Sequence, residues 1–317
     1  MIRMLQDLTG IDPLEIPLDS KEVMSLFQNT SALGIKPEDI GGTKLGALGI
    51  PEFGTDFAMQ MLMDTKPQYF SDLVRIAGLA HGTDVWLGNA QTLIKEGKAT
   101  ISTAICTRDD IMIYLIQKGL DSEESFKIME MVRKGKVASG KCKEWPEWKQ
   151  DMIDHGVPDW YIWSCERIKY MFPKAHAAAY VMMAWRVAYC KVFYPLAYYT
   201  AYFSIRATAF DYEKMAMSPV RLEHYIAEYK AKKAEGTISN TEEDELGVMR
   251  IVQEMHARGY EFTPIDIYKA KARTFQIIDG KIMPSFKVIS KVGEVAGESI
   301  ETVSYTHLRA HETLRHL

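Results

Sequence analysis

The stretch Lys169-Tyr-Met-Phe-Pro-Lys-Ala-His-Ala-Ala-Ala-Tyr180 marks the beginning of the longest helix that the sequence predicts. Pro173 suits a helix start, because the first turn of a helix does not need the backbone N–H that proline lacks. The apolar pattern then continues to Tyr194, and Pro195 ends it. Segments on both sides share the same helical spacing of apolar residues. The chain is therefore expected to be mainly α-helical.

Charged and aromatic side chains gather at the start of this helix. The N–H groups of a first helical turn form a natural anion site; Lys174 adds a positive charge there and His176 a hydrogen-bond donor. Tyr170 and Tyr180 are both near enough to stack on a ring, and the sequence does not choose between them. Taken alone, His176 would be interpreted as a capped histidine at the start of a core helix. The residues near it, which include Lys174, Tyr170 and Arg167, favour a phosphate-binding site.

The composition describes a chain with a sizeable core and no general attraction to nucleic acid. Its 317 residues are enough for about two domains, and 47% of them are hydrophobic. The net charge of −4 leaves DNA binding to local basic patches. Four cysteines without close spacing indicate free thiols in a reducing cytosol. Arg186 and Lys191 interrupt the apolar run, so we expect a buried helix, no membrane contact and a cytoplasmic protein.

The pattern of elements changes near residue 211. Before that point, caps and apolar spacing predict helices over residues 20–27, 56–64, 69–78, 107–119, 122–133, 145–155, 159–170, 173–194 and 196–206. After it come two charged amphipathic helices, at 218–234 and 241–258. Short strands are then expected at 261–267 and 274–278, with a hairpin turn at Asp279-Gly280. Residues 282–300 have the outline of a helix–hairpin–helix, and a domain boundary is expected between residues 211 and 218.

Two charged clusters have structural explanations of their own. The turn Arg133-Lys-Gly-Lys136 follows a predicted helix, where the helix dipole favours cations, so alone it would be a solvated turn. Asp109 and Asp110 follow Arg108 at a predicted helix start, where the dipole favours acids, and we reject them as a Mg²⁺ site. The sequence contains no acidic pair within an apolar strand that would hold two metal ions. No catalytic residue is therefore assigned.

Several motifs, taken together and in order, resemble those of one polymerase family. They are Gly49-Ile-Pro-Glu-Phe-Gly-Thr55, His81-Gly-Thr-Asp-Val-Trp86 with Asn89-Ala-Gln91, Thr107-Arg-Asp-Asp110, Arg133-Lys-Gly-Lys136 and the segment from Tyr170 to Tyr180. Over residues 1–301 the chain resembles a C-terminal part of the PolC-type DNA polymerase III alpha subunit. That family comprises the replicative DNA-directed DNA polymerases of low-GC Gram-positive bacteria. The resemblance implies a helical fingers domain, followed by a small α+β segment with a partial helix–hairpin–helix.

The resemblance also implies a division of the chain. Residues 1–212 correspond to the fingers, with residues 1–15 at the edge of the palm, and residues 213–301 begin the duplex-binding domain. The family's palm aspartates lie upstream of the position that matches Met1. Mg²⁺ would be bound by that palm and not by this chain. Alone, the chain is expected to hold substrates without extending a primer.

In the family, the fingers bind the incoming deoxynucleoside triphosphate (dNTP). Carried over by motif, Lys174 and His176 face the triphosphate, and Tyr170 or Tyr180 packs against the base or sugar. Further phosphate-binding candidates are Arg108, Arg133, Lys134 and Lys136. The other implied partners are template–primer DNA, the rest of the polymerase chain and, for the full-length protein, the sliding clamp and the replisome.

The last part of the chain departs from the family pattern. Lys291 stands where the hairpin usually has glycine, and Lys291 and Gly293 are the candidate DNA-binding residues. Residues 302–317 do not continue the pattern and resemble translated adapter sequence. We predict that they form a non-native tail, and assign no function to His307, His311 and His316.

A second hypothesis is a non-enzymatic helical DNA-binding protein that uses the hairpin near Val292-Gly293. It predicts salt-sensitive duplex binding that survives Lys174→Ala and His176→Ala. The acidic net charge and the missing second hairpin helix argue against it. A third, a helical scaffold without a ligand, leaves the cluster around Lys174 unexplained.

Overall fold

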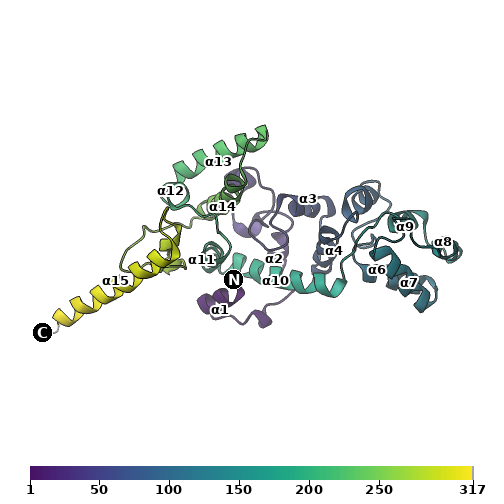
Figure 1. Ribbon diagram of the computed structural model, residues 1–317, viewed down its shortest axis with the longest axis horizontal. Helices are drawn as coiled ribbons and strands as arrows, with labels where there is room; N and C mark the ends of the chain where they lie inside the picture. The colour runs from purple at the N-terminus through teal and green to yellow at the C-terminus, as the bar shows by residue number, and fades with distance from the viewer. Residues whose placement is uncertain (316–317) are drawn as a thin grey trace. The chain divides into compact units, whose positions relative to one another are not determined.

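The chain forms two compact units that are interleaved in sequence. A computed structural model describes the backbone of residues 1–315 and the side chains of residues 1–304 (Figure 1). The first unit consists of Met1–Ile16, Asn29–Gly49 and Arg186–Leu317, and the second of Pro17–Gln28 and Ile50–Trp185. The described residues are mainly helical, as predicted, with one two-stranded sheet. These units divide the chain differently from the predicted boundary near residue 212, which stays a prediction.

The second unit is built from short helices. In chain order they are α2 (Lys21–Ser25), α3 (Asp56–Thr65), α4 (Phe70–His81), the irregular turn η4 (Trp86–Ala90), α5 (Gln91–Lys95), α6 (Arg108–Lys118), α7 (Ser122–Arg133), α8 (Trp145–Asp154), α9 (Asp159–Cys165) and the first part of α10 (Lys174–Phe193). Asp121 caps α7 by accepting hydrogen bonds from the N–H groups of Glu123 and Glu124. Helices α6 and α7 pack against each other as an antiparallel pair (Figure 1).

An aromatic core anchors the middle of α10 in the second unit. Trp185 is buried, stacks on Phe27 with ring centroids 6.2 Å apart, and donates a hydrogen bond to the carbonyl of Pro17. Phe27 also meets Phe53 edge to face at 5.1 Å. Aromatic pairs in this geometry add to the stability gained from burial alone. The middle of α10 is therefore packed against the N-terminal segment of this unit.

The first unit combines longer helices with a small sheet. Its elements are α1 (Ile2–Thr9), η1 (Pro13–Glu15), η2 (Ser31–Leu33), η3 (Pro37–Ile40), the remainder of α10, α11 (Pro195–Ile205), α12 (Tyr212–Met215), α13 (Pro219–Glu235), α14 (Asn240–Ala257), β1 (Gln276–Ile278), β2 (Lys281–Met283), η5 (Phe286–Val288) and α15 (Glu294–Arg315). None of the described helices is long and apolar enough to cross a membrane.

A fully buried ion pair lies at the centre of the first unit. The ammonium of Lys191 lies 2.9 Å and 3.0 Å from the two carboxylate oxygens of Glu254. It also donates to the carbonyls of Gly46, at 2.7 Å, and Leu48, at 2.5 Å. Burial lowers the pKa of Lys191 to about 8, and the carboxylate of Glu254 opposes this shift, so the ammonium stays charged at neutral pH. The sequence pattern had indicated only that Lys191 interrupts an apolar run.

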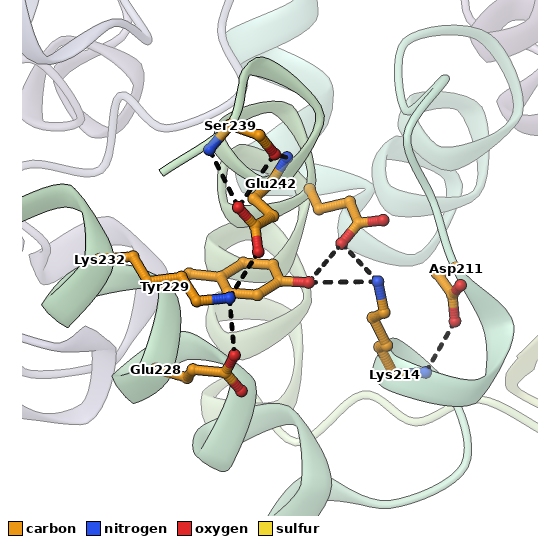
Figure 2. Close-up of polar contacts among 8 residues, drawn as sticks. Asp211, Lys214, Glu228, Tyr229, Lys232, Ser239 and Glu242 are labelled. Carbon is orange, nitrogen blue, oxygen red and sulfur yellow. Dashed lines mark hydrogen bonds and ion pairs between the residues drawn. The ribbon is translucent and has the colours of Figure 1, made fainter. Parts of the chain in front are cut away.

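Polar contacts join α13 and α14 at the surface of the first unit. Lys232 pairs with Glu228 of its own helix at 2.9 Å and with Glu242 of α14 at 2.6 Å (Figure 2). Glu242 also closes a capping box with Ser239, each side chain accepting from the other's N–H. A second cluster attaches α12 to this helix pair through Lys214, Tyr229 and Glu245.

The predicted hairpin is confirmed, but two neighbouring predictions are not. Strands β1 and β2 are antiparallel, and Asp279 and Gly280 both have positive φ, of 50° and 75°, as the two-residue turn between them requires. Residues 261–267 do not form the expected strand and contribute a single bridge, between Phe262 and Ile282. The helix–hairpin–helix is not confirmed, because only the 3₁₀ turn η5 precedes the loop before α15.

Candidate functional site

An extended segment, residues 168–173, leads into α10 and brings distant parts of the second unit together. The predicted helix over residues 159–170 is wrong here, since α9 ends at Cys165. Instead, Tyr170 forms a bridge with Thr83, whose N–H donates to the carbonyl of Tyr170 at 2.9 Å. Met171 then donates to the carbonyl of Arg133 at 3.2 Å. These bonds align the His81–Trp86 motif and the Arg133–Lys136 turn with the start of α10.

Two motif glycines allow this segment to pass so close. Gly135 has a φ of +66°, and a Cβ there would lie 2.5 Å from the carbonyl oxygen of Lys169. A Cβ on Gly82 would lie 2.9 Å from the carbonyl oxygen of Tyr170. Real Cβ atoms do not approach backbone this closely, so both positions require glycine. This explains why glycine follows Lys134 in the basic turn and His81 in its motif.

Lys174 and His176 are both exposed in the first turn of α10, as the anion-site prediction requires. One amide of that turn is already occupied, however. The N–H of Lys174 donates to a carboxylate oxygen of Asp109 at 2.7 Å. The expectation that the first-turn amides are free is therefore wrong for this amide. No sequence signal connects Asp109 with a residue 65 positions further along the chain.

A row of aromatic rings begins before α10 and continues onto its exposed face. The ring centroid of His176 lies 4.7 Å from that of Phe172, which precedes the helix, and 4.7 Å from that of Tyr180, one turn later. Phe172 in turn lies 5.2 Å from His81, whose Nε2 is 2.6 Å from the carboxylate of Glu52. The ring of His176 is thus held between two aromatic neighbours instead of projecting freely.

The two tyrosines left open by the sequence occupy different places. Tyr180 is 38% exposed and shares its helix face with His176. Tyr170 is 44% exposed and lies on the extended segment, next to Met171, whose N–H donates to the carbonyl of Arg133. Tyr180 therefore adjoins the rings of α10, and Tyr170 adjoins the basic turn.

The start of α6 contributes Arg108 and a tightly bound carboxylate. Arg108 donates its backbone N–H to the carbonyl of Phe172 at 3.1 Å, which attaches α6 to the entrance of α10. Its Nε is buried and has no hydrogen-bond partner among the described residues. The carboxylate of Asp110 accepts from the N–H groups of Cys106 and Thr107 and lies 3.6 Å from Arg75. The hydroxyl of Thr107 is likewise buried without a partner, so two neighbouring side chains at the start of α6 have unused hydrogen-bonding groups.

In the basic turn, two of the three cations already have an acidic partner. Arg133 forms a bidentate ion pair with the carboxylate of Glu130, and the ammonium of Lys134 lies 2.8 Å from an oxygen of the same carboxylate. The hydrogen bonds from Arg133 lower the pKa of Glu130 to about 2, and Glu130 in turn raises the pKa of Arg133. Lys136 is exposed and has no ion pair among the described side chains. Helical i, i+3 and i, i+4 spacing would have revealed Glu130 from the sequence.

Comparison with known proteins gives this site a context. Residues 1–156 match the family model described as the bacterial DNA polymerase III alpha subunit finger domain. The chain is 51% identical over 316 residues, 98% of its length, to a PolC-type DNA polymerase III of Streptococcus suis, and covers 22% of that relative. It is also 51% identical over 300 residues, 95% of its length, to the PolC-type enzyme of Bacillus subtilis, and covers 20% of it. This chain belongs to the PolC-type DNA polymerase III family. It spans about a fifth of the length of the curated relatives it matches.

The described residues of this PolC-type chain do not form a metal site. They contain no group of three or more histidine, cysteine or acidic side chains placed to hold a metal ion. At the candidate site, Asp109 is engaged by the Lys174 amide and Asp110 by two amides of its own loop. These residues do not fit the Mg²⁺ that polymerase chemistry implies, and no step through the metal is assigned to them.

The candidate DNA-binding residues lie in the first unit, just before α15. Lys291 has a φ of 68°, the left-handed conformation for which glycine is the usual choice, and Gly293 directly precedes α15. Nearby cations are largely paired with acids: Lys271 with Glu301, and Arg273 with Glu294 and Glu298. The expected tail, residues 302–317, continues α15 as far as Arg315. Its side chains beyond residue 304, and residues 316–317 altogether, lie outside the described part, so the tail stays a prediction.

Proposed function

We propose that the second unit binds the triphosphate of an incoming dNTP within a replicative DNA polymerase of the PolC type. The observation that supports this most directly is the extended segment before α10, which is hydrogen-bonded both to Arg108 and to the basic turn. Arg108 bonds to Phe172, and the turn that bears Lys136 bonds to Met171 through Arg133. Arg108 and the basic turn thus both attach to the segment that leads into one helix N-terminus, which itself favours anions.

Each group has a distinct role in this proposal. Lys174 and Arg108 neutralise the phosphates, and Lys136 extends the positive region. His176, held between its aromatic neighbours, donates to a phosphate oxygen. Tyr180 packs against the base or sugar, because it shares the exposed face of α10 with His176. Tyr170, Arg133 and Lys134 form the outer edge of the same region.

In the whole polymerase these residues would position the nucleotide rather than perform chemistry. A primer 3′ hydroxyl would attack the α-phosphate in line as its bond to the β-phosphate breaks and pyrophosphate leaves, and Mg²⁺ held by palm carboxylates elsewhere in the polymerase would stabilise the transferring charge. The proposed partners are the dNTP, template–primer DNA through Lys291 and Gly293 among others, and the remainder of the polymerase. The sliding clamp and the replisome are proposed partners of the full-length protein. This chain alone is expected not to extend a primer.

A series of ligands with decreasing phosphate number tests the proposal. The chain would be titrated by calorimetry, in buffer containing EDTA, with dTTP, dTDP, dTMP and thymidine. Charge-assisted hydrogen bonds contribute about 1.5–3 kcal/mol each, so each phosphate removed should weaken binding about tenfold or more. Equal affinity for dTTP and thymidine, or no detectable binding of dTTP, would contradict a triphosphate site.

A further inference from the structure

The carboxylate of Asp109 stands at the place where a phosphate oxygen is expected. It accepts the N–H of Lys174, at 2.7 Å, and so occupies an amide at the N-terminus of α10. This bond joins α6 to α10 across 65 residues and is not a local cap of α6. A carboxylate and a phosphate oxygen are alike in charge and in accepting from backbone N–H groups. The two would compete for the same donor.

The adjacent acids Asp109 and Asp110 have different hydrogen-bond and ion-pair partners. Asp110 is satisfied by the amides of Cys106 and Thr107 and lies near Arg75. Asp109, among the described side chains, makes no ion pair, although it is flanked in sequence by the buried and unpartnered Nε of Arg108. The structure therefore holds an acidic group at the anion site, and a basic group beside it remains without an acceptor.

We propose that Asp109 is a positioning residue that occupies the α10 amide until the triphosphate displaces it. This inference rests on the proposed function. When dNTP binds, a phosphate oxygen takes the N–H of Lys174, and the carboxylate of Asp109 moves away into solvent. Any phosphate ligand must then provide enough energy to displace a charged acceptor, which keeps weakly binding anions out of the site. No covalent bond changes in this exchange.

Asp109→Asn tests the inference, because an amide oxygen keeps the geometry of the acceptor but loses its charge. A neutral acceptor is a weaker competitor than a carboxylate, so dTTP should bind about tenfold more tightly to the variant than to the wild-type chain. Thymidine, which carries no phosphate, should bind with unchanged affinity. Asp109→Ala should also tighten dTTP binding, because it leaves the amide free. If Asp109 served only to hold the start of α10, both variants would instead weaken dTTP binding.

Asp159→Asn is the matched control. Asp159 is an exposed acid in the first turn of α9 in the same unit, so its replacement removes the same net charge and leaves the bond between Asp109 and the Lys174 amide in place. At 0.15 M salt its effect on dTTP binding should stay below about twofold, because salt screens solvent-exposed charges. Circular dichroism melting of all variants checks that each one folds.

The outcomes separate this inference from the proposed function. If the wild-type chain binds dTTP in the phosphate-dependent way but Asp109→Asn binds no more tightly, or no more tightly than Asp159→Asn, the inference alone fails. If neither the wild-type chain nor Asp109→Asn binds dTTP, the proposed function fails, and the inference fails with it.

Discussion

Replacing Lys191 with methionine is expected to destabilise the first unit strongly. Methionine has a similar length, so packing is largely kept while the ammonium and its four hydrogen-bonding contacts are lost. Glu254 then remains as a fully buried carboxylate, with the hydroxyl of Tyr199 as its remaining donor at 2.7 Å. The carbonyl of Gly46 also loses its donor.

The expected loss follows from that uncompensated charge. Removing one partner of a buried ion pair typically costs about 3–5 kcal/mol, because the other charge stays in a poorly solvating interior. The double variant Lys191→Met with Glu254→Gln removes the charge altogether. It should therefore be more stable than Lys191→Met alone, with a coupling of at least about 1 kcal/mol.

Urea unfolding followed by circular dichroism measures both quantities. Lys127→Met is the control, since Lys127 pairs with Glu123 on an exposed face of α7, and its loss should change stability by less than about 0.5 kcal/mol. A cost below about 1 kcal/mol for Lys191→Met, or a double variant as unstable as the sum of the single changes, would refute the reasoning.

Two further predictions concern charge and backbone conformation. The hydrogen bonds from Arg133, together with Lys134, lower the pKa of Glu130 to about 2. The ionised carboxylate therefore contributes fully to stability above the ordinary glutamate pKa of about 4.3, and this contribution is lost as the pH falls toward 2. Urea unfolding should therefore show Glu130→Gln less stable than the wild-type chain at pH 7 and the difference smaller at pH 2.5; an unchanged difference would count against this pairing. Lys291→Gly should stabilise the first unit by about 1 kcal/mol, since it relieves a left-handed φ of 68°. Lys287→Gly, which removes a hydrogen bond to Ser204, should destabilise it, and a similar response to both changes would be inconsistent with strain at Lys291.

Local sequence signals predicted most of the helices, because residues within or next to a helix largely determine where it begins and ends. Capping residues, terminal glycines and apolar spacing placed α6, α7 and α14 close to their observed ends. The end of α9 was not predictable in this way. Its predicted continuation over residues 166–170 has apolar spacing compatible with a helix, but the bridge from Tyr170 to Thr83 and the bond from Met171 to the Arg133 carbonyl favour an extended backbone there. Tertiary hydrogen bonds there override local preference.

The candidate site shows the same contrast. Its positive residues were predictable, because Lys174 and His176 follow a proline at a helix start. Their acidic counterparts were partly predictable: Glu130 lies one helical turn from Arg133, whereas Asp109 meets Lys174 only through the fold. The buried partner of Lys191 is likewise 63 residues away. Pairings at such separations depend on chain topology, which single-sequence patterns do not contain.

The most direct test of the central proposal is the affinity of Lys174→Ala for dTTP, measured by calorimetry beside the wild-type chain. Lys118→Ala, an exposed lysine at the end of α6, serves as the control for net charge. If Lys174 holds the triphosphate, its loss should weaken dTTP binding by about 10- to 100-fold and leave thymidine binding unchanged, while Lys118→Ala changes neither. Equal affinity of the wild-type chain and Lys174→Ala for dTTP would contradict a triphosphate site at the start of α10.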